Sequence, residues 1–132
     1  MSERKELVGF NPWCSDIQVE RLEAVSYLVG RPRTRLAADI VIRSLLEPPS
    51  QEVIQRSETG PVSQNRVFFY LGSEDAQNLY KLAGENGIRP NTTARRLINH
   101  SLNALVEELP HIDLVADLRR GLQQRLSPKL GK

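Results

Sequence analysis

Residues 8–49 have the sequence VGFNPWCSDIQVERLEAVSYLVGRPRTRLAADIVIRSLLEPP, and residues 65–106 have the sequence NRVFFYLGSEDAQNLYKLAGENGIRPNTTARRLINHSLNALV. Shifted by 57 positions, the two stretches align without a gap and share five identical residues, among them Gly30 with Gly87 and Ser44 with Ser101. They also share an order of parts: an extended segment, a helix ending at glycine, a tight turn and a second helix. This order predicts a repeated structural unit, which decides the fold.

Each repeat begins with a short segment, at residues 8–14 and 66–71, that is predicted to be a β-strand. Alternate residues of a strand point to opposite sides, so each segment has an apolar side and an outer side. The predicted apolar positions are Phe10, Pro12, Cys14, Val67, Phe69 and Leu71. The predicted outer positions are Gly9, Asn11, Trp13, Arg66, Phe68 and Tyr70. Pro12 has no N–H to donate to a ladder, so it is expected at an edge or a bulge.

Apolar residues at helical spacing predict two helices in each repeat, at residues 15–29, 35–47 and 74–86 and from Asn91 onward. Polar residues precede each apolar pattern and are predicted N-caps: Ser15 or Asp16, Thr34, Ser73 and Asn91. Gly30 and Gly87 are predicted to end the first helix of each repeat. The predicted apolar faces are Leu22, Val25 and Val29; Ala37, Ile40, Val41, Ser44 and Leu45; Ala76, Leu79, Leu82 and Ala83; and Ala94, Leu97, Ile98, Ser101, Leu102 and Leu105.

The chain divides into five predicted segments. They are a charged N-terminus at 1–7, a first repeat at 8–49, a linker at 50–64, a second repeat at 65–109 and a C-terminal amphipathic helix with a basic tail at 110–132. A unit of about 42 residues rarely buries enough surface to fold alone, so the two repeats are expected to form one structural domain. The predicted fold is therefore mainly α-helical, with a short two-stranded antiparallel ribbon.

The C-terminal helix carries a predicted apolar stripe that consists of Leu114, Val115, Leu118, Leu122 and Leu126. This stripe can dock on the other helices, mediate self-association, or recruit a partner such as a relaxase, a coupling protein or a toxin. The basic tail that begins at Arg119 can add non-specific affinity for DNA.

Composition excludes several classes of protein. The net charge is only +2, although 14 of the 18 basic residues are Arg, which is suited to bidentate contact with phosphate or guanine. Cys14 is the only cysteine and is expected to be a buried apolar residue, and His100 and His111 do not have metal-ligand spacing. Without an apolar run of roughly 20 residues or a glycine-rich phosphate loop, the sequence predicts a cytoplasmic protein that is not an enzyme and needs no cofactor or metal.

The repeated pattern resembles the ribbon-helix-helix family, to which the Arc, MetJ and CopG repressors belong. In each repeat the strand ends at an apolar residue (Cys14, Leu71), and a core leucine, a turn glycine and a polar residue follow at the same spacing. Members of this family dimerise so that two strands form one antiparallel ribbon over four helices. Two copies in one chain are similar to the tandem proteins of conjugative DNA transfer, the TraY-type relaxosome accessory proteins. The resemblance implies an internal pseudo-dimer that binds double-stranded DNA as a monomer, with several copies on adjacent sites where such sites occur.

The resemblance also implies which residues contact DNA. The outer face of the ribbon lies in the major groove in this family, which makes its outer residues candidates for reading bases: Asn11, Trp13, Arg66, Phe68 and Tyr70. The N-termini of the second helices face the DNA backbone, which makes the residues there candidates for binding phosphates: Arg31, Arg33, Thr34, Arg35, Arg89, Asn91, Thr92 and Thr93.

Three outer positions are aromatic, where the family usually has polar or basic side chains. Trp13, Phe68 and Tyr70 can contact DNA, or they can pack under the C-terminal helix or in an oligomer contact. The predicted role is that of an accessory factor in conjugative or T-DNA processing. A transcriptional repressor of the same fold, or an antitoxin-like protein-interaction module that docks through the aromatic face or the C-terminal helix, remains an alternative.

Overall fold

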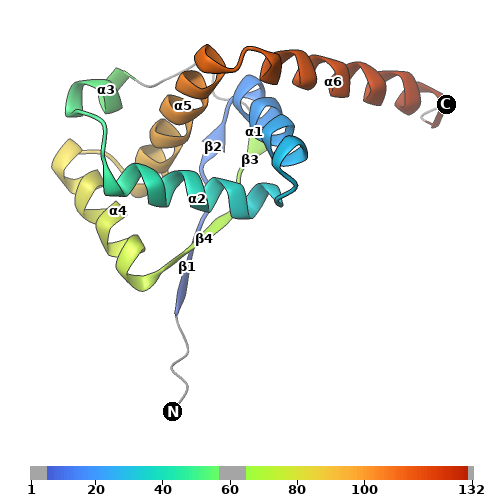
Figure 1. Ribbon diagram of the computed structural model, residues 1–132. Helices are drawn as coiled ribbons and strands as arrows, with labels where there is room; N and C mark the ends of the chain where they lie inside the picture. Colours follow the sequence, from blue (N-terminus) through green and yellow to red (C-terminus); the bar gives the residue numbers. More distant parts are fainter. Residues whose placement is uncertain (1–5, 57–64, 131–132) are drawn as a thin grey trace.

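The structure is a computed structural model that describes residues 6–56 and 65–130, the last five of them by backbone alone. The elements in chain order are β1 (Leu7–Phe10), β2 (Trp13–Cys14), α1 (Asp16–Val29), α2 (Arg33–Leu46), α3 (Gln51–Arg56), β3 (Asn65–Arg66), β4 (Phe69–Gly72), α4 (Ser73–Asn86), α5 (Pro90–Glu108) and α6 (His111–Leu130). The described part is mainly helical, as the sequence predicts; in the view of Figure 1, β2 and β3 lie above α2 and β1 and β4 lie below it.

Strands from the two halves of the chain pair in antiparallel fashion, β1 with β4 and β2 with β3. The register pairs Leu7 with Gly72, Phe10 with Phe69 and Trp13 with Arg66. Each predicted strand is interrupted for two residues, Asn11 and Pro12 on one side and Val67 and Phe68 on the other, and the register is the same on both sides of this gap. Pro12 cannot donate a hydrogen bond, but its carbonyl accepts one from the Val67 N–H at 2.9 Å. The four short strands therefore continue one another as a single two-stranded antiparallel ribbon, with β1 and β2 on one side and β4 and β3 on the other. We call it the ribbon.

The two sides of the ribbon differ in burial as the alternation predicts. The inner positions, Phe10, Pro12, Cys14, Val67, Phe69 and Leu71, are all buried. The Phe10 and Phe69 rings stack at 5.4 Å between centroids and help to join the two halves. Cys14 is fully buried, as expected for a small apolar residue.

A single hydrophobic core lies beneath the ribbon and draws residues from both repeats and from α3 and α6. The predicted apolar faces of α4 and α5 enter it, as do Leu22 and Val25 of α1. Val29 was predicted to join them, but it is exposed because it lies in the last turn of α1, just before the chain turns at Gly30. Gly30 and Gly87 have φ angles of 71° and 66°, a left-handed conformation that ends both helices.

Three of the four predicted N-caps are wrong. Ser15 caps α1, since its Oγ accepts a hydrogen bond from the Gln18 N–H at 3.4 Å. The N-cap positions of the other helices lie one or two residues earlier than predicted, at Gly72, Pro32 and Arg89, and none has a side-chain cap. Pro90 occupies the first position of α5, where its missing N–H costs no hydrogen bond.

Part of the predicted linker is helical. Helix α3 covers Gln51–Arg56, while residues 57–64 lie outside the described residues. Ser50 starts this helix, since its Oγ accepts from the Val53 N–H at 3.2 Å, and Ile54 is buried in the core. The Gln55 side chain donates to the Asn86 carbonyl at 2.9 Å and ties α3 to the end of α4. A helix with one buried residue leaves little periodicity in the sequence, which is why it was missed.

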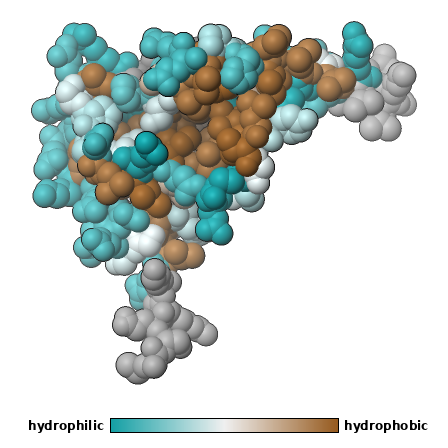
Figure 2. Space-filling view, in the orientation of Figure 1, coloured by the Kyte–Doolittle hydropathy of each residue, from teal (hydrophilic) through white to brown (hydrophobic). Residues whose placement is uncertain are grey.

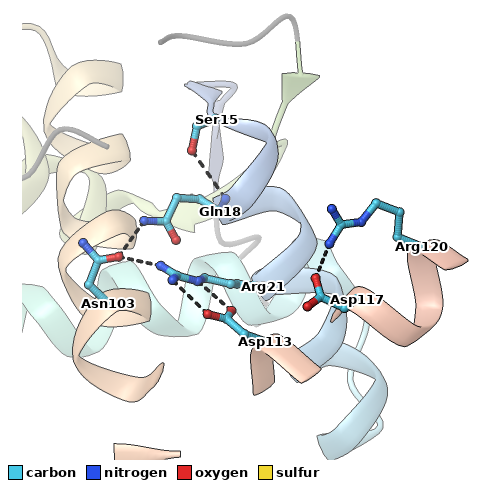
Figure 3. A network of polar contacts seen from close by, with 7 residues as sticks. All are labelled: Ser15, Gln18, Arg21, Asn103, Asp113, Asp117 and Arg120. Atoms are coloured by element: carbon cyan, nitrogen blue, oxygen red, sulfur yellow. Dashed lines mark hydrogen bonds and ion pairs between the residues drawn. The ribbon is translucent and has the colours of Figure 1, made fainter. Parts of the chain in front are cut away.

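Helix α6 packs on α1 with a face other than the predicted one. Ile112 and Ala116 are buried, whereas Leu114, Leu118 and Leu122 are exposed. Figure 3 shows the polar contacts that fix this orientation, with the Arg21 guanidinium lying between Asn103 and Asp113. Arg21 donates to the two Asp113 carboxylate oxygens at 2.9 and 3.0 Å and to Asn103 Oδ1 at 2.7 Å. Of the alternatives for this helix, docking is observed, and of the predicted stripe Val115 packs against the core whereas Leu114, Leu118 and Leu122 do not; the Leu126 side chain lies outside the described residues.

Candidate functional site

The outer face of the ribbon is uncovered in the part of the chain that the structure describes. Trp13, Phe68 and Tyr70 are 38%, 50% and 59% exposed, and Arg66 is also exposed. Helix α6 packs on α1 and α5, so the three aromatic rings do not pack under it. Of the alternatives that the sequence left open for these rings, contact with DNA or with another protein remains.

Two contacts organise this face. The Arg66 guanidinium lies 4.3 Å from the centroid of the Trp13 ring, in a cation–π contact between paired residues of the two strands. At the equivalent position toward the other end of the ribbon, Gly9 pairs with Tyr70. A Cβ atom at Gly9 would lie 3.2 Å from the Tyr70 ring, so glycine allows this ring to lie against the strand. As a result, the Trp13 and Tyr70 rings each lie close to a residue of the opposite strand of the ribbon.

Asn11 connects the ribbon to the start of α5. Its backbone N–H donates to Asn91 Oδ1 at 3.2 Å, and Asn91 Nδ2 donates in return to Asn11 Oδ1 at 3.2 Å. Asn91 therefore binds the ribbon instead of capping its own helix. The Asn11 amide oxygen is thus engaged by Asn91, and Asn11 positions the start of α5.

A groove lies between this edge of the ribbon and the N-terminus of α5, and we call it the α5 groove. It has a volume of about 470 Å³. Six of the predicted DNA-contacting residues line it, namely Asn11, Trp13, Arg66, Arg89, Asn91 and Thr92. Arg95 and Tyr80 also line it, and no acidic residue does. The groove therefore combines positive charge, aromatic surface and a helix N-terminus, which favours an anionic ligand.

The predicted phosphate-binding residues at the first turn of α5 are not all accessible. The Arg89 side chain makes no ion pair with the described residues and is exposed, and Thr92 is half-buried. Thr93 is fully buried, and its hydroxyl donates to the Arg89 carbonyl at 3.0 Å. The prediction that Thr93 binds phosphate is therefore wrong, because its side chain faces the core.

The corresponding turn of α2 is largely neutralised by acids of its own chain. Arg31 pairs with Asp39 at 2.7 Å and Arg33 pairs with Glu23 at 2.9 Å. Thr34 and Arg35 are exposed and make no ion pair with the described residues. The segment RPRTR, which has the densest positive charge in the sequence, thus offers only Arg35 as an uncompensated cation.

Arg95 and Tyr80 are the groove residues that the sequence did not indicate. Arg95 lies four residues after Asn91, so helical spacing places the two on the same face of α5. That spacing was the available signal for Arg95. Tyr80 lies on α4, and its ring is 5.9 Å from the Phe10 ring, a contact between halves that sequence spacing does not reveal.

No protein-family model matches the chain, and no curated protein or solved structure is similar enough to indicate a relative. Within residues 6–56 and 65–130, no three His, Cys, Asp or Glu side chains come together in a group that could hold a metal ion. Among the described helices, none has the length and apolar character needed to cross a membrane.

Proposed function

We propose that this protein binds double-stranded DNA with the outer face of its ribbon, and that its halves form an internal pseudo-dimer of ribbon-helix-helix type. The observation that carries the proposal is the α5 groove, in which the uncovered ribbon adjoins a helix N-terminus with three arginines and no acid. A two-stranded ribbon has the size that enters the major groove of B-DNA, and helix N-termini bind backbone phosphates.

The relation between the two halves supports the pseudo-dimer. Helices α1 and α4 each have 14 residues, and their starts at Asp16 and Ser73 differ by the same 57 positions that align the repeats. Ser44 and Ser101, which are equivalent under this shift, lie 3.2 Å apart between their hydroxyl oxygens. A two-fold rotation that exchanges the two halves also maps the paired residues of the ribbon onto one another. Asn11 and Phe68, which lie opposite each other and are equivalent under the 57-residue shift, are at the centre of this rotation. Contacts between equivalent residues are typical of a symmetric dimer interface.

The two ends of the ribbon differ in charge, and this difference gives the proposed complex a direction. At the α5 end the exposed Arg66 and Arg89 line the groove and make no ion pair with the described residues, whereas at the α2 end Arg31 and Arg33 are paired with acids. We therefore expect the α5 end to bind DNA more strongly. A site for this protein should be asymmetric, with one half-site contributing most of the affinity.

For the biological role we propose an accessory factor in conjugative or T-DNA processing, on the sequence resemblance alone. A transcriptional repressor with the same DNA-binding surface is the second candidate. The half-exposed aromatic rings and the net charge of +2 favour a third, a protein-docking face. A titration with duplex DNA, followed by Trp13 emission and by the anisotropy of the duplex, distinguishes DNA binding from protein docking.

Trp13 is the only tryptophan in the chain and lies on the proposed DNA-binding face, so its emission reports directly on that face. We expect titration with a mixed-sequence duplex to change the Trp13 emission at the same DNA concentrations that raise the anisotropy of a labelled duplex. Raising the salt concentration should weaken both signals, with a log–log slope near −0.9 for each phosphate contacted.

A matched pair of variants separates the ribbon from the overall charge. Arg66→Gln and Arg56→Gln change the net charge equally, but Arg56 lies on α3 and pairs with Glu52. Arg66→Gln should weaken binding and relax sequence preference, while Arg56→Gln should leave both nearly unchanged. Binding without a change in Trp13 emission, or with equal losses in the two variants, would place the DNA elsewhere. No binding at low salt would favour the docking face.

A further inference from the structure

Phe68 lies at the centre of the outer face of the ribbon. It is opposite Asn11, at the centre of the rotation that relates the two halves of the chain. Its neighbours in the sequence, Val67 and Phe69, are buried beneath the ribbon, whereas Phe68 is 50% exposed. A ring that projects from the middle of a DNA-binding ribbon is positioned to meet a base pair near the middle of the DNA site.

The start of α5 is fixed beside this position. Asn11 exchanges two hydrogen bonds with Asn91 in the first turn of α5, each of 3.2 Å. Arg89 immediately precedes this helix, is exposed and makes no ion pair with the described residues. A phosphate bound by Arg89 would therefore set the register of the duplex relative to Phe68, because phosphate contacts position a protein on DNA and base contacts supply the specificity.

The chemistry of Phe68 favours one group on the edge of a base. Its ring has no hydrogen-bond donor or acceptor, unlike Trp13 and Tyr70, the other two aromatic residues of the outer face. In the major groove guanine, adenine and cytosine present polar groups, whereas thymine also presents a 5-methyl group. Covering a polar group with the ring deprives that group of water, while covering the methyl group buries apolar surface on both sides. A cytosine that is methylated at C5 carries the same methyl group at the same place.

We propose that Phe68 is a specificity-determining residue that recognises the 5-methyl group of a pyrimidine near the centre of the DNA site. Thymine or 5-methylcytosine would then be preferred at this position, and methylation of a cytosine there would strengthen binding. The recognition rests on the proposed function, since it requires the outer face of the ribbon to lie in the major groove. Burial of one methyl group against the ring should change the affinity about fourfold.

Exposed apolar surface by itself does not identify such a contact. Figure 2 shows apolar side chains gathered along α6 and over the neighbouring α1, neither of which is part of the ribbon. Leu118 of α6 is 60% exposed, slightly more than Phe68. What distinguishes Phe68 is its place on the ribbon, beside a helix start at which Arg89 is available to a phosphate. Leu118 therefore provides a matched control for the loss of an exposed apolar side chain.

The test starts from a duplex that the wild-type protein selects from a random-sequence pool. Single bases are then changed without altering their hydrogen-bonding groups: deoxyuridine replaces thymine, which removes the methyl group, and 5-methylcytosine replaces cytosine, which adds it. At one position near the centre of the site, the anisotropy of the labelled duplex should show about fourfold tighter binding with the methyl group than without it. Where thymine occupies this position, duplexes with cytosine and with 5-methylcytosine in its place should differ by the same factor.

Variants of the full chain assign the effect to Phe68. Phe68→Ala should abolish the difference between methylated and unmethylated bases at that position, and Phe68→Leu should retain part of it. Both variants should fold, because the side chain is already half-exposed. Leu118→Ala should keep the full difference, and it controls for any effect of the methyl group on the duplex itself.

The possible results separate this recognition from DNA binding as such. A difference that persists in Phe68→Ala, or wild-type binding that no methyl group affects, would overturn the recognition of a methyl group and leave DNA binding by the ribbon intact. No binding of any duplex at low salt would refute the proposed function, and the recognition of a methyl group with it.

Discussion

Arg89→Gln tests whether the start of α5 faces the DNA backbone. The Arg89 side chain lines the α5 groove and makes no ion pair with the described residues, so its charge is available to one phosphate. Releasing the counter-ions of one phosphate contributes about 0.9 to the slope of log affinity against log salt. Arg89→Gln should therefore weaken binding by about fivefold at 0.15 M salt and about fifteenfold at 0.05 M.

The assay is the anisotropy of a labelled duplex, measured for the wild type and the variant at several salt concentrations. Arg33→Gln is the matched control because it changes the net charge equally, although Arg33 is already paired with Glu23 at 2.9 Å. We expect the control to alter the slope by less than half as much as Arg89→Gln. Equal changes in slope would mean that net charge drives binding, and an unchanged slope for Arg89→Gln would refute the proposed contact.

Three further predictions concern the fold. Gly30→Ala should destabilise the protein by about 1–2 kcal/mol in urea unfolding, because a Cβ at φ 71° meets no atom within 4 Å but strains the backbone. Gly84→Ala, in the last turn of α4 with equally open surroundings, should instead stabilise it by about 0.5–1 kcal/mol, and a loss in both variants would argue against the left-handed turn. Phe69→Ala removes a fully buried ring from the centre of the ribbon and should cost about 3–5 kcal/mol. Unfolding should remain a single transition whether followed by Trp13 emission or by far-UV circular dichroism, and separate transitions would contradict the shared core.

The strands illustrate what local sequence can predict. A strand exposes alternate residues to opposite sides, so the pattern of Phe10, Pro12 and Cys14 against Gly9, Asn11 and Trp13 was enough to assign the two faces. The glycine turns are equally local, because the left-handed backbone conformation is disfavoured for every residue except glycine and, occasionally, asparagine or aspartate. These predictions depended on a few neighbouring residues and were confirmed.

The caps show where this reasoning fails. Asn91 has a preferred side chain for an N-cap, but it binds Asn11, 80 residues earlier in the chain. Thr34 lies one residue inside α2, because the extended backbone of Pro32 starts the helix earlier. Cap preferences amount to about 1 kcal/mol, so a tertiary hydrogen bond or a backbone constraint can outweigh them.

Tertiary contacts also decided which arginines of the candidate site are paired with acids. The density of arginines in RPRTR made the start of α2 a candidate phosphate site, but Glu23 and Asp39 neutralise two of these arginines in the folded protein. The less basic segment at α5 keeps Arg89 uncompensated, and Arg66 of the ribbon lines the same groove. Counting charges along the chain could not distinguish these ends, since the distances to acids depend on how the helices pack.

The sequence by itself determined the two faces of the ribbon and the turns that end α1 and α4, because each follows from periodicity or backbone preference over a few residues. The tertiary structure alone decided which arginines remain available, which groove they line and which side of α6 is buried. The last case gives the physical reason: α6 has apolar residues on both sides, and the ion pair of Asp113 with Arg21, together with the small Ala116, selects the side that packs on α1. Selections of this kind depend on contacts between residues far apart in the chain, and local patterns do not encode them.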